Sequence, residues 1–432
     1  MLLTTMALLL VLLVLAVPVA ATLGVLGIAL DQIYAGGRLV IGMGDTVWQN
    51  AISSILVAVP MFIMLGEILL RAGIADRMYG AMSKWLAWLP GGNMHANIGS
   101  CALFAASSGS SVATAATVGV VATPEIERRG YNERLFLGTI AAGGTLGILI
   151  PPSINLIIYG LLTNSSVPRL YLAGFIPGAI LAAMFSMTVL IACVARPRWG
   201  GQRIRFNLRN CIRVLPDLLP PLLIFMVVVG SIYAGIATPT EAASLGVVGA
   251  LALSAFNGTL NLKMLSDVFE GTMKTTAMVM LIILAAVFLN FALAQIGLTK
   301  QLTDFVLGLG LSPVETMIAI IIFYVVLGCF METLSMMLTT TPLVFPIVQS
   351  LGYDAIWFGI VLTILMETAL ITPPVGVNLY VVHGVREGRG TIADVIIGSS
   401  PFVLSMFGLI VLLMIWPDIA LWLPNTLMGV GQ

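Results

Sequence analysis

Residues 147–155 read "GILIPPSIN" and residues 370–378 read "LITPPVGVN", so a Pro-Pro pair stands inside two apolar stretches. The pairs lie 222 residues apart, and the same offset relates "RRGY", ending at residue 131, to "SLGY", ending at residue 353. It also relates "LGVLG" at 23–27 to "LGVVG" at 245–249. Proline has no backbone N–H, so the carbonyl oxygen one turn before it loses its hydrogen-bond partner and the helix is interrupted there. The pattern therefore predicts an internal repeat with one broken helix in each half.

The composition indicates a membrane protein. Of the 432 residues, 59% are hydrophobic and 9% are charged. A soluble fold cannot cover so much apolar surface with so few charges. Residues 1–30 lack the basic start of a cleaved signal and predict one long first membrane helix. Further segments reach the ~20 residues needed to cross a bilayer, namely 175–195, 214–236, 276–294 and 402–423. We predict an all-α polytopic membrane protein.

The basic residues indicate how the chain is oriented. Cytoplasmic loops of membrane proteins are enriched in Lys and Arg, although exposed loops also collect arginine for other reasons. The linker 196–213 is therefore predicted to be cytoplasmic, because it contains Arg196, Arg198, Arg203, Arg205, Arg209 and Arg213. The same side is predicted for Arg71, Arg77, Lys84, Arg128, Arg129 and Arg134.

With the basic loops inside, residues 93–129 enter and leave on the cytoplasmic side, which makes them a re-entrant helical hairpin. Their counterpart 314–350 then begins and ends outside, so the two halves are inverted. The first repeat is predicted to span 1–195, with its broken helix at 132–164, and the second 214–432, with its broken helix at 355–385. Inverted repeats with broken helices are typical of secondary transporters.

Hydroxyl side chains gather at both predicted hairpins. Residues 106–117 read "ASSGSSVATAAT", and residues 332–342 read "ETLSMMLTTTP". Together with carbonyls freed by the proline breaks, hydroxyls form a set of neutral oxygens suited to a small hard cation such as Na⁺. Helix N-termini at the same place favour a carboxylate. The alternative for any single Ser or Thr is helix packing, and Asn155 and Asn378 could simply bridge helices.

Two carboxylates, Glu332 and Glu367, fall within apolar segments. An intramembrane carboxylate is costly unless it is paired or hydrated, so each is a functional candidate. The alternative is a structural hydrogen bond to a helix end.

Several functions are disfavoured. A net charge of zero gives no sign of a nucleic-acid partner, and the four cysteines show no metal-binding spacing. A membrane enzyme would need a catalytic dyad, but His95 and His383 have no evident partner, and GxSxG and HExxH are absent. We predict that the chain is not an enzyme.

The motifs resemble those of the large membrane subunit of TRAP (tripartite ATP-independent periplasmic) transporters. In the first half these are "SSGSSVATAATVG", "PEIERRGY" and "PPSINLIIYG". In the second half they are "GCFMETLSMMLTTTPLVFPIV", "LGYDAIWFGIV" and "TPPVGVNLYVV". The resemblance covers nearly the whole chain. It implies an elevator-type, Na⁺-coupled importer in the bacterial inner membrane, with amphipathic arms at 74–90 and 259–275.

The resemblance also implies partners and site residues. A periplasmic binding protein would deliver a carboxylate substrate, and a separate small four-helix membrane subunit would complete the complex. One Na⁺ site would involve Ser108, Ser110, Ser111, Gly147, Pro151 and Ser153. A second would involve Thr339, Thr340, Thr341, Thr372, Pro373 and Gly376. The substrate would lie between them, near Gly109, Asn155, Glu332 and Asn378.

One alternative remains within transport. A stand-alone Na⁺- or H⁺-coupled dicarboxylate or citrate carrier shares the inverted-hairpin architecture, and it would work without a soluble binding protein.

Overall fold

The computed structural model describes residues 1–15, 17–202, 206–386 and 390–429, and these parts of the chain are helical, without a strand. Up to the linker the helices are α1 (Leu2–Val14), α2 (Val19–Tyr34), η1 (Val40–Gly42), α3 (Met43–Ala51), α4 (Ser54–Arg71), α5 (Ile74–Leu86), α6 (Asn93–Ser108), α7 (Ser111–Ala122), α8 (Pro124–Arg129), α9 (Glu133–Thr145), α10 (Ile154–Thr163) and α11 (Val167–Ala195). The linker contains η2 (Pro197–Trp199) and α12 (Leu208–Arg213). The second half contains α13 (Leu215–Tyr233), α14 (Pro239–Phe256), α15 (Leu262–Gln295), α16 (Leu298–Gly308), α17 (Pro313–Gly328), α18 (Thr333–Ser350), α19 (Ala355–Leu370), α20 (Val377–Val385), α21 (Ile392–Ile415) and α22 (Asp418–Met428).

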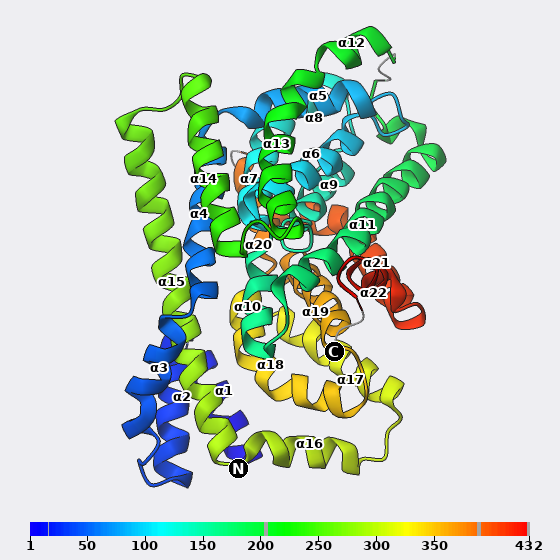
Figure 1. Ribbon diagram of the computed structural model, residues 1–432. Coiled ribbons are helices and arrows are strands. Elements are labelled where there is room, and N and C mark those ends of the chain that lie inside the picture. The colour runs from blue at the N-terminus through cyan, green and yellow to red at the C-terminus, as the bar shows by residue number, and fades with distance from the viewer. Residues whose placement is uncertain (16, 203–205, 387–389, 430–432) are drawn as a thin grey trace.

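The prediction of an all-α polytopic membrane fold is confirmed. Among the described residues, six helices are long and apolar enough to cross a membrane, namely α4, α11, α13, α14, α15 and α21. The helices of the two halves follow one another in the same order, so that α6, α7, α9 and α10 correspond to α17, α18, α19 and α20. Figure 1 shows α6 and α7 in the upper half of the molecule and α17 and α18 in the lower half. The two helical pairs therefore lie at opposite ends.

Two predicted helices are in fact interrupted. The single first helix predicted over 1–30 is wrong, because α1 ends at Val14 and α2 begins after Pro18. The hydroxyl of Tyr34 donates to Thr4 Oγ1 over 2.8 Å, which brings the end of α2 back to the start of α1. The predicted segment 402–423 likewise crosses a helix boundary at Trp416 and Pro417. In both places proline removes a donor that a continuous helix needs.

The predicted amphipathic arm at 259–275 is also wrong. Residues 262–275 form the first part of α15, which continues without interruption to Gln295. No proline interrupts this helix. The counterpart of α5 is instead α16, since both helices begin after a glycine of positive φ, Gly73 at 67° and Gly297 at 74°.

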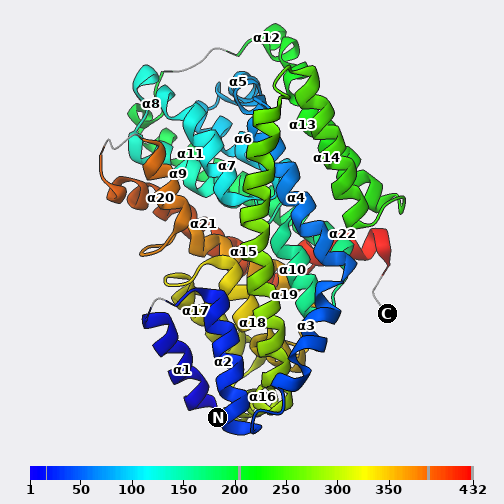
Figure 2. The same cartoon turned by 90° about the vertical axis from the view of Figure 1, so that its left-hand side faces the viewer.

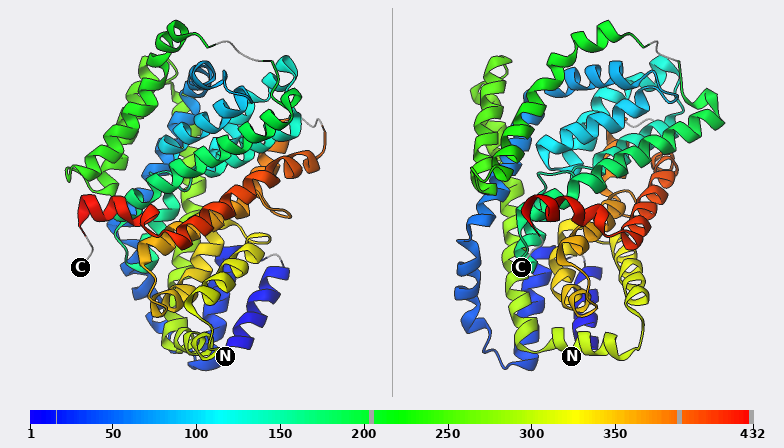
Figure 3. Two further views of the ribbon diagram at one scale, coloured as in Figure 1. Left: turned by 90° about the vertical axis from the view of Figure 1, so that its right-hand side faces the viewer. Right: turned by 45° about the vertical axis from the view of Figure 1, so that its right-hand side comes forward.

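One side of the molecule is built on α15. This helix runs along most of the length of the molecule beside α2 and α4, and α14 packs against α4 (Figure 2). On the other side, α11 and α21 run next to each other (Figure 3). The hairpin helices and the broken helices lie between these two layers.

The two halves meet closely where α9 crosses α21. A Cβ placed on Gly138 would lie 2.0 Å from the carbonyl oxygen of Gly398, and a Cβ on Gly398 would lie 1.8 Å from the carbonyl oxygen of Arg134. No side chain fits at either position. Two glycines thus allow the backbones of the first and second repeats to touch.

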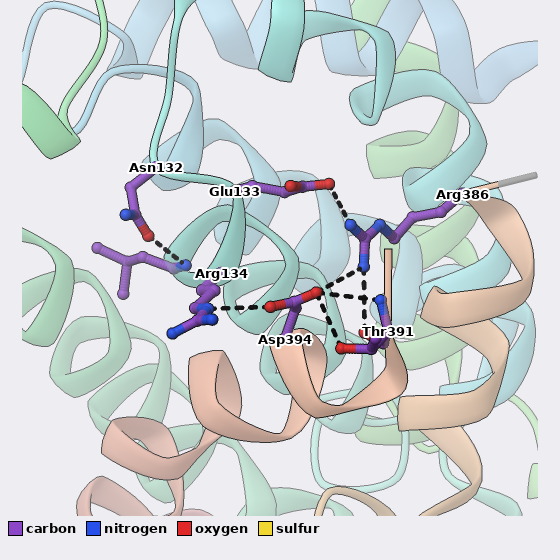
Figure 4. Close-up of polar contacts among 7 residues, drawn as sticks. Asn132, Glu133, Arg134, Arg386, Thr391 and Asp394 are labelled. Carbon is purple, nitrogen blue, oxygen red and sulfur yellow. Dashed lines mark hydrogen bonds and ion pairs between the residues drawn. The ribbon is translucent and has the colours of Figure 1, made fainter. Parts of the chain in front are cut away.

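An ionic cluster joins the same two halves at one end of this crossing (Figure 4). Arg386, at the end of α20, has a side chain only 3% exposed. It pairs with Glu133 of α9 and lies 3.6 Å from Asp394 of α21. Arg134 donates to Asp394 over 2.9 Å, and the Thr391 hydroxyl donates to the same carboxylate. We call these five residues the Arg386 cluster.

Replacement of Arg386 by glutamine should lower the free energy of unfolding by about 2 kcal/mol. This figure lies between the ~3–5 kcal/mol of a broken buried pair and the ~0–1 kcal/mol of a surface pair, because Glu133 is half exposed. Thermal unfolding in detergent measures the change. The control is Arg128→Gln, since the Arg128 side chain is 74% exposed in its pair with Glu125. Equal shifts for both variants would contradict this role.

The basic segments gather at one end of the molecule. Figure 1 shows α5, α8 and α12 at the upper end. The thiol of Cys211, in α12, donates to the carbonyl oxygen of Lys84, and the Gln202 N–H donates to the Arg129 carbonyl oxygen. The linker is therefore folded onto the other basic loops. Arg203 and Arg205, also predicted to belong to this group, lie outside the described residues.

Candidate functional site

The first hairpin turns between α6 and α7, at the run of serines. Gly109 has φ 62°, a left-handed conformation that glycine adopts without strain. The Ser110 hydroxyl accepts the N–H of Ala113 and so caps α7. Ser108 is buried, and its hydroxyl lies 3.2 Å from that of Thr114, which donates to the Ser110 carbonyl oxygen. Local sequence therefore determines the turn, and we call residues 108–111 the first tip.

The first broken helix opens between Thr145 and Ile154, and we call residues 146–153 the first break. Pro151 and Pro152 supply no N–H, so α9 cannot continue into α10. Ser153 caps α10 by accepting the N–H of Leu156, and its hydroxyl donates to the Ile148 carbonyl oxygen over 2.5 Å.

The first tip rests directly on the first break. A Cβ on Gly147 would lie 2.8 Å from both the carbonyl carbon of Ser110 and the nitrogen of Ser111. A Cβ on Gly109 would lie 2.7 Å from the Pro152 carbonyl oxygen. The Ser111 hydroxyl donates to the Thr145 carbonyl oxygen over 3.2 Å. The residues predicted for the first cation site are thus brought together, and Gly109 lies against the break itself.

The second tip, residues 329–332, carries a carboxylate where the first has a serine. Glu332 stands 222 residues after Ser110 and is likewise the cap of the following helix. Its Oε2 accepts the Ser335 N–H over 3.0 Å and the Ser335 hydroxyl over 3.1 Å, while Oε1 accepts the Thr333 hydroxyl over 3.0 Å. These contacts match the structural alternative for Glu332, a bond to a helix end.

The second break, residues 371–376, approaches the second tip through its backbone. The N–H of Val375 donates to the Cys329 carbonyl oxygen over 3.3 Å. Gly376 caps α20, and the Thr372 hydroxyl donates back to the Thr368 carbonyl oxygen over 2.7 Å. The second break, which contains Pro373, therefore contacts the second tip at Cys329.

The threonines predicted for the second cation site lie further along α18. Thr339, Thr340 and Thr341 are buried and follow the second tip by about two helical turns. Thr339 donates to the Ser335 carbonyl oxygen over 2.7 Å, and Thr340 lies 2.8 Å from the hydroxyl of Tyr324 on α17. The hydrogen bonds of Thr339 and Thr340 thus stay within their own hairpin.

Two buried asparagines lie at equivalent places, each being the second residue of the helix after a break. In the described structure Asn155 Nδ2 has no hydrogen-bond partner. Asn378 Nδ2 donates to the Ala141 carbonyl oxygen of α9 over 3.2 Å, but its Oδ1 has no partner among the described residues. A buried amide atom without a partner is uncommon, so these atoms suggest contact with a ligand or water.

The structure adds two residues that sequence reasoning missed. Tyr324 is fully buried against Thr340, and Thr145 supplies the carbonyl oxygen that holds Ser111. Tyr324 could have been noticed as a lone tyrosine in an apolar run. Thr145 carries no comparable signal, because its role depends on how α7 packs against α9.

No group of three or more His, Cys, Asp or Glu side chains that could hold a metal occurs in the described part of the chain.

The all-helical membrane fold, with two hairpin tips that approach two broken helices, is the construction of an inverted-repeat membrane transporter. Residues 6–419 match the family model described as "Tripartite ATP-independent periplasmic transporter, DctM component", and the chain belongs to this family. The resemblance noted from the motifs is confirmed. Members of the family are transporter permeases, so the prediction that the chain is not an enzyme is also confirmed.

Similar proteins cover nearly the full length. The chain is 31% identical over 439 residues to the C4-dicarboxylate TRAP transporter large permease protein DctM of Vibrio cholerae, with 96% of each chain covered. It is 35% identical to the DctM protein of Rhodobacter capsulatus, covering 86% of this chain and 87% of the relative. It is 30% identical to the sialic acid TRAP transporter large permease protein SiaM of Vibrio cholerae, covering 87% and 88%.

The fold also resembles a solved transporter. The crystal structure of YdaH from Alcanivorax borkumensis matches with a TM-score of 0.65, covering 97% of this chain and 99% of that one, at 16% identity. At this identity the likeness concerns the fold alone.

Proposed function

We propose that this chain is the translocating subunit of a Na⁺-coupled importer of an organic acid. The observation that carries the proposal is the contact between hairpin tip and broken helix, which recurs in both repeats. Each contact gathers backbone carbonyls and hydroxyls that the breaks leave available. A cation bound there would hold the hairpin tip against the broken helix.

Neutral oxygens give the proposed cation sites their selectivity. The first site would use Ser108, Ser110, Ser111, Gly147, Pro151 and Ser153. The second would use Thr372, Pro373 and Gly376, with Thr339, Thr340 and Thr341 further along the hairpin. A hard cation such as Na⁺ prefers oxygen ligands, and neutral ones leave its positive charge available to a neighbouring carboxylate. Cation and anion would therefore bind more tightly together than apart.

The substrate would lie near Asn155 and Asn378, which are buried at the starts of α10 and α20. A helix N-terminus favours a carboxylate by about 0.3–1 kcal/mol at exposed sites, and the unpartnered Nδ2 of Asn155 can donate a hydrogen bond to it. Gly109 and Glu332 would lie close to the bound substrate, with Glu332 acting through its cap on α18. The names of the relatives include C4-dicarboxylates and sialic acid, both of which are carboxylates.

The proposal includes partners and a place in the cell. A periplasmic binding protein would deliver the acid, and a small four-helix membrane subunit would complete the complex in the bacterial inner membrane. The hairpins and broken helices would shift as one elevator-like unit against α15. Such a shift requires that the loaded and empty states differ in affinity.

Uptake into proteoliposomes tests this function. The chain and its small subunit are reconstituted, and labelled C4-dicarboxylates, sugar acids and 2-oxoacids are offered with and without the cognate binding protein. The expected result is uptake that requires both the binding protein and an inward Na⁺ gradient. Uptake without the binding protein would favour the stand-alone carrier, and uptake without Na⁺ would refute the proposal that Na⁺ is the coupling ion.

Within this assay, Ser110→Gly should raise the half-saturating Na⁺ concentration about tenfold, which corresponds to the ~1.4 kcal/mol of one lost hydroxyl ligand. Glycine is chosen because replacing an N-cap serine with glycine lowers the stability of the helix by only about a few tenths of a kcal/mol. The control is Ser350→Ala at the far end of α18, where the hydroxyl donates to the Ile347 carbonyl oxygen. An unchanged Na⁺ dependence in Ser110→Gly would exclude this residue from the site.

A further inference from the structure

We propose that Glu367 is a proton-binding site whose carboxyl group takes up and releases one proton. The proton site itself is inferred from the structure, and its place in a transport cycle rests on the function proposed above.

Glu367 lies where the two broken helices come together. It belongs to the last turn of α19, just before the second break, and its side chain is fully buried. Neither carboxyl oxygen has a hydrogen-bond partner among the described residues. The backbone N–H of Leu149, in the first break, lies near this carboxyl. A carboxyl of the second repeat therefore faces a backbone donor of the first.

The charged and titratable groups of the neighbouring helices are engaged elsewhere. Tyr159 of α10 donates to the Ala355 carbonyl oxygen, Tyr171 of α11 to that of Ser153, and Tyr324 of α17 bonds with Thr340. The other such groups also bond to residues other than Glu367. They are Glu133 and Arg134 of α9, Arg169 of α11, Glu315 of α17, Glu332 at the start of α18, Tyr380 of α20, Arg386 at the end of α20, and Asp394 of α21. His383 of α20 and Asp418 of α22 have no described bond to it. In the described structure, no cation neutralises Glu367.

A buried carboxylate without a partner would cost several kcal/mol. Glu367 therefore carries a proton in this conformation. A carboxylic acid with a purely structural role has its O–H and C=O bonded by neighbouring protein groups or by ordered water, and among the described residues those of Glu367 have no such partner. Its partner must come from outside this arrangement, either as water or as a donor brought closer when a break moves.

The first repeat shows what a satisfied side chain at this position looks like. Thr145 stands 222 residues before Glu367 in the corresponding helix α9. Its hydroxyl donates to the Ala142 carbonyl oxygen over 2.8 Å, and its own carbonyl oxygen accepts the Ser111 hydroxyl. The repeats therefore differ in chemistry at this position, because the first has a threonine there and the second has a carboxyl.

Infrared spectroscopy of the purified chain with its small subunit tests the proton site without any substrate. The wild type should show a carbonyl stretch of a protonated carboxyl that shifts in D₂O and disappears as the pH is raised. The band should be missing in Glu367→Gln and present in Glu332→Gln, the exposed control. Glu367→Asp, which keeps a carboxyl, should shift the band, and it provides the assignment if the glutamine variant does not fold. A band that stays in Glu367→Gln, or one that does not respond to pH, would overturn the proposal.

Proton movement during uptake places the site in the cycle. Proteoliposomes that contain a pH-sensitive dye are offered the same labelled acids, and uptake by the wild type should acidify the lumen. Glu367→Gln should lose this acidification while it retains exchange of internal for external substrate. Equal acidification in both would refute a role in coupling. If no acid is taken up, the proposed function fails, whereas the infrared titration still decides for or against the proton site.

Discussion

Replacing Gly398 with alanine is expected to prevent the stable packing of α9 on α21. The added Cβ would lie 1.8 Å from the Arg134 carbonyl oxygen, and backbone cannot move aside as a flexible side chain can. Overpacking of a close contact costs about 1–3 kcal/mol and occasionally more, and a backbone clash as close as this should reach at least the top of that range. We expect little monodisperse protein and a melting temperature far below that of the wild type.

The control for this variant is Gly249→Ala. Its Cβ would lie 3.8 Å from Ile224 Cγ1, an ordinary contact, and alanine favours a helix over glycine by about 1 kcal/mol. It should leave stability unchanged or slightly increased. If Gly398→Ala behaved in the same way, the direct backbone contact between the two repeats would be wrong.

Replacing Gly147 with alanine is expected to abolish Na⁺-dependent uptake while much of the protein remains folded. The new methyl group would push against the backbone of Ser110 and Ser111 and would separate the first tip from the first break. A tip displaced by even a few tenths of an ångström weakens every oxygen contact to a shared cation. We expect a loss of at least tenfold in uptake, equivalent to about 1.4 kcal/mol.

The matched variant is Gly44→Ala on α3, where no atom lies within 4 Å of the added Cβ. It should transport at the wild-type rate. Size-exclusion profiles separate misfolding of Gly147→Ala from a functional loss. Full uptake by well-folded Gly147→Ala would mean that the tip and the break need not touch during transport.

Local signals accounted for much of the fold. The Pro-Pro pairs, the serine run and the 222-residue offset are short-range features, and helices begin and end where these features predict. The failures have physical reasons. Pro18 divides the predicted first helix, although membrane helices often tolerate proline. The arm at 259–275 was an expectation from the family resemblance, and residues 262–275 instead continue directly into the apolar part of α15.

The candidate site was less predictable. The turn at the first tip can be predicted from the sequence, because a turn-forming glycine and a helix-capping serine depend only on residues close to them in the chain. Their contact with Gly147 depends on the packing of α7 against α9, which no local pattern reveals. Thr339 and Thr340 show the opposite case, since their hydroxyls bond within their own hairpin rather than at its tip.

The length of α15 has a consequence for how the protein sits in its membrane. At about 1.5 Å per residue, its 34 residues extend roughly 51 Å, well beyond the ~30 Å hydrocarbon layer. All of its charged residues precede residue 275, and the 21 uncharged residues that follow would span about 32 Å. Lys274, paired with Glu270, therefore marks the water boundary on the side of the basic loops. Because α2 and α4 pack along the same helix, they share this fixed depth, and it provides the reference level against which any vertical movement of the hairpins can be measured.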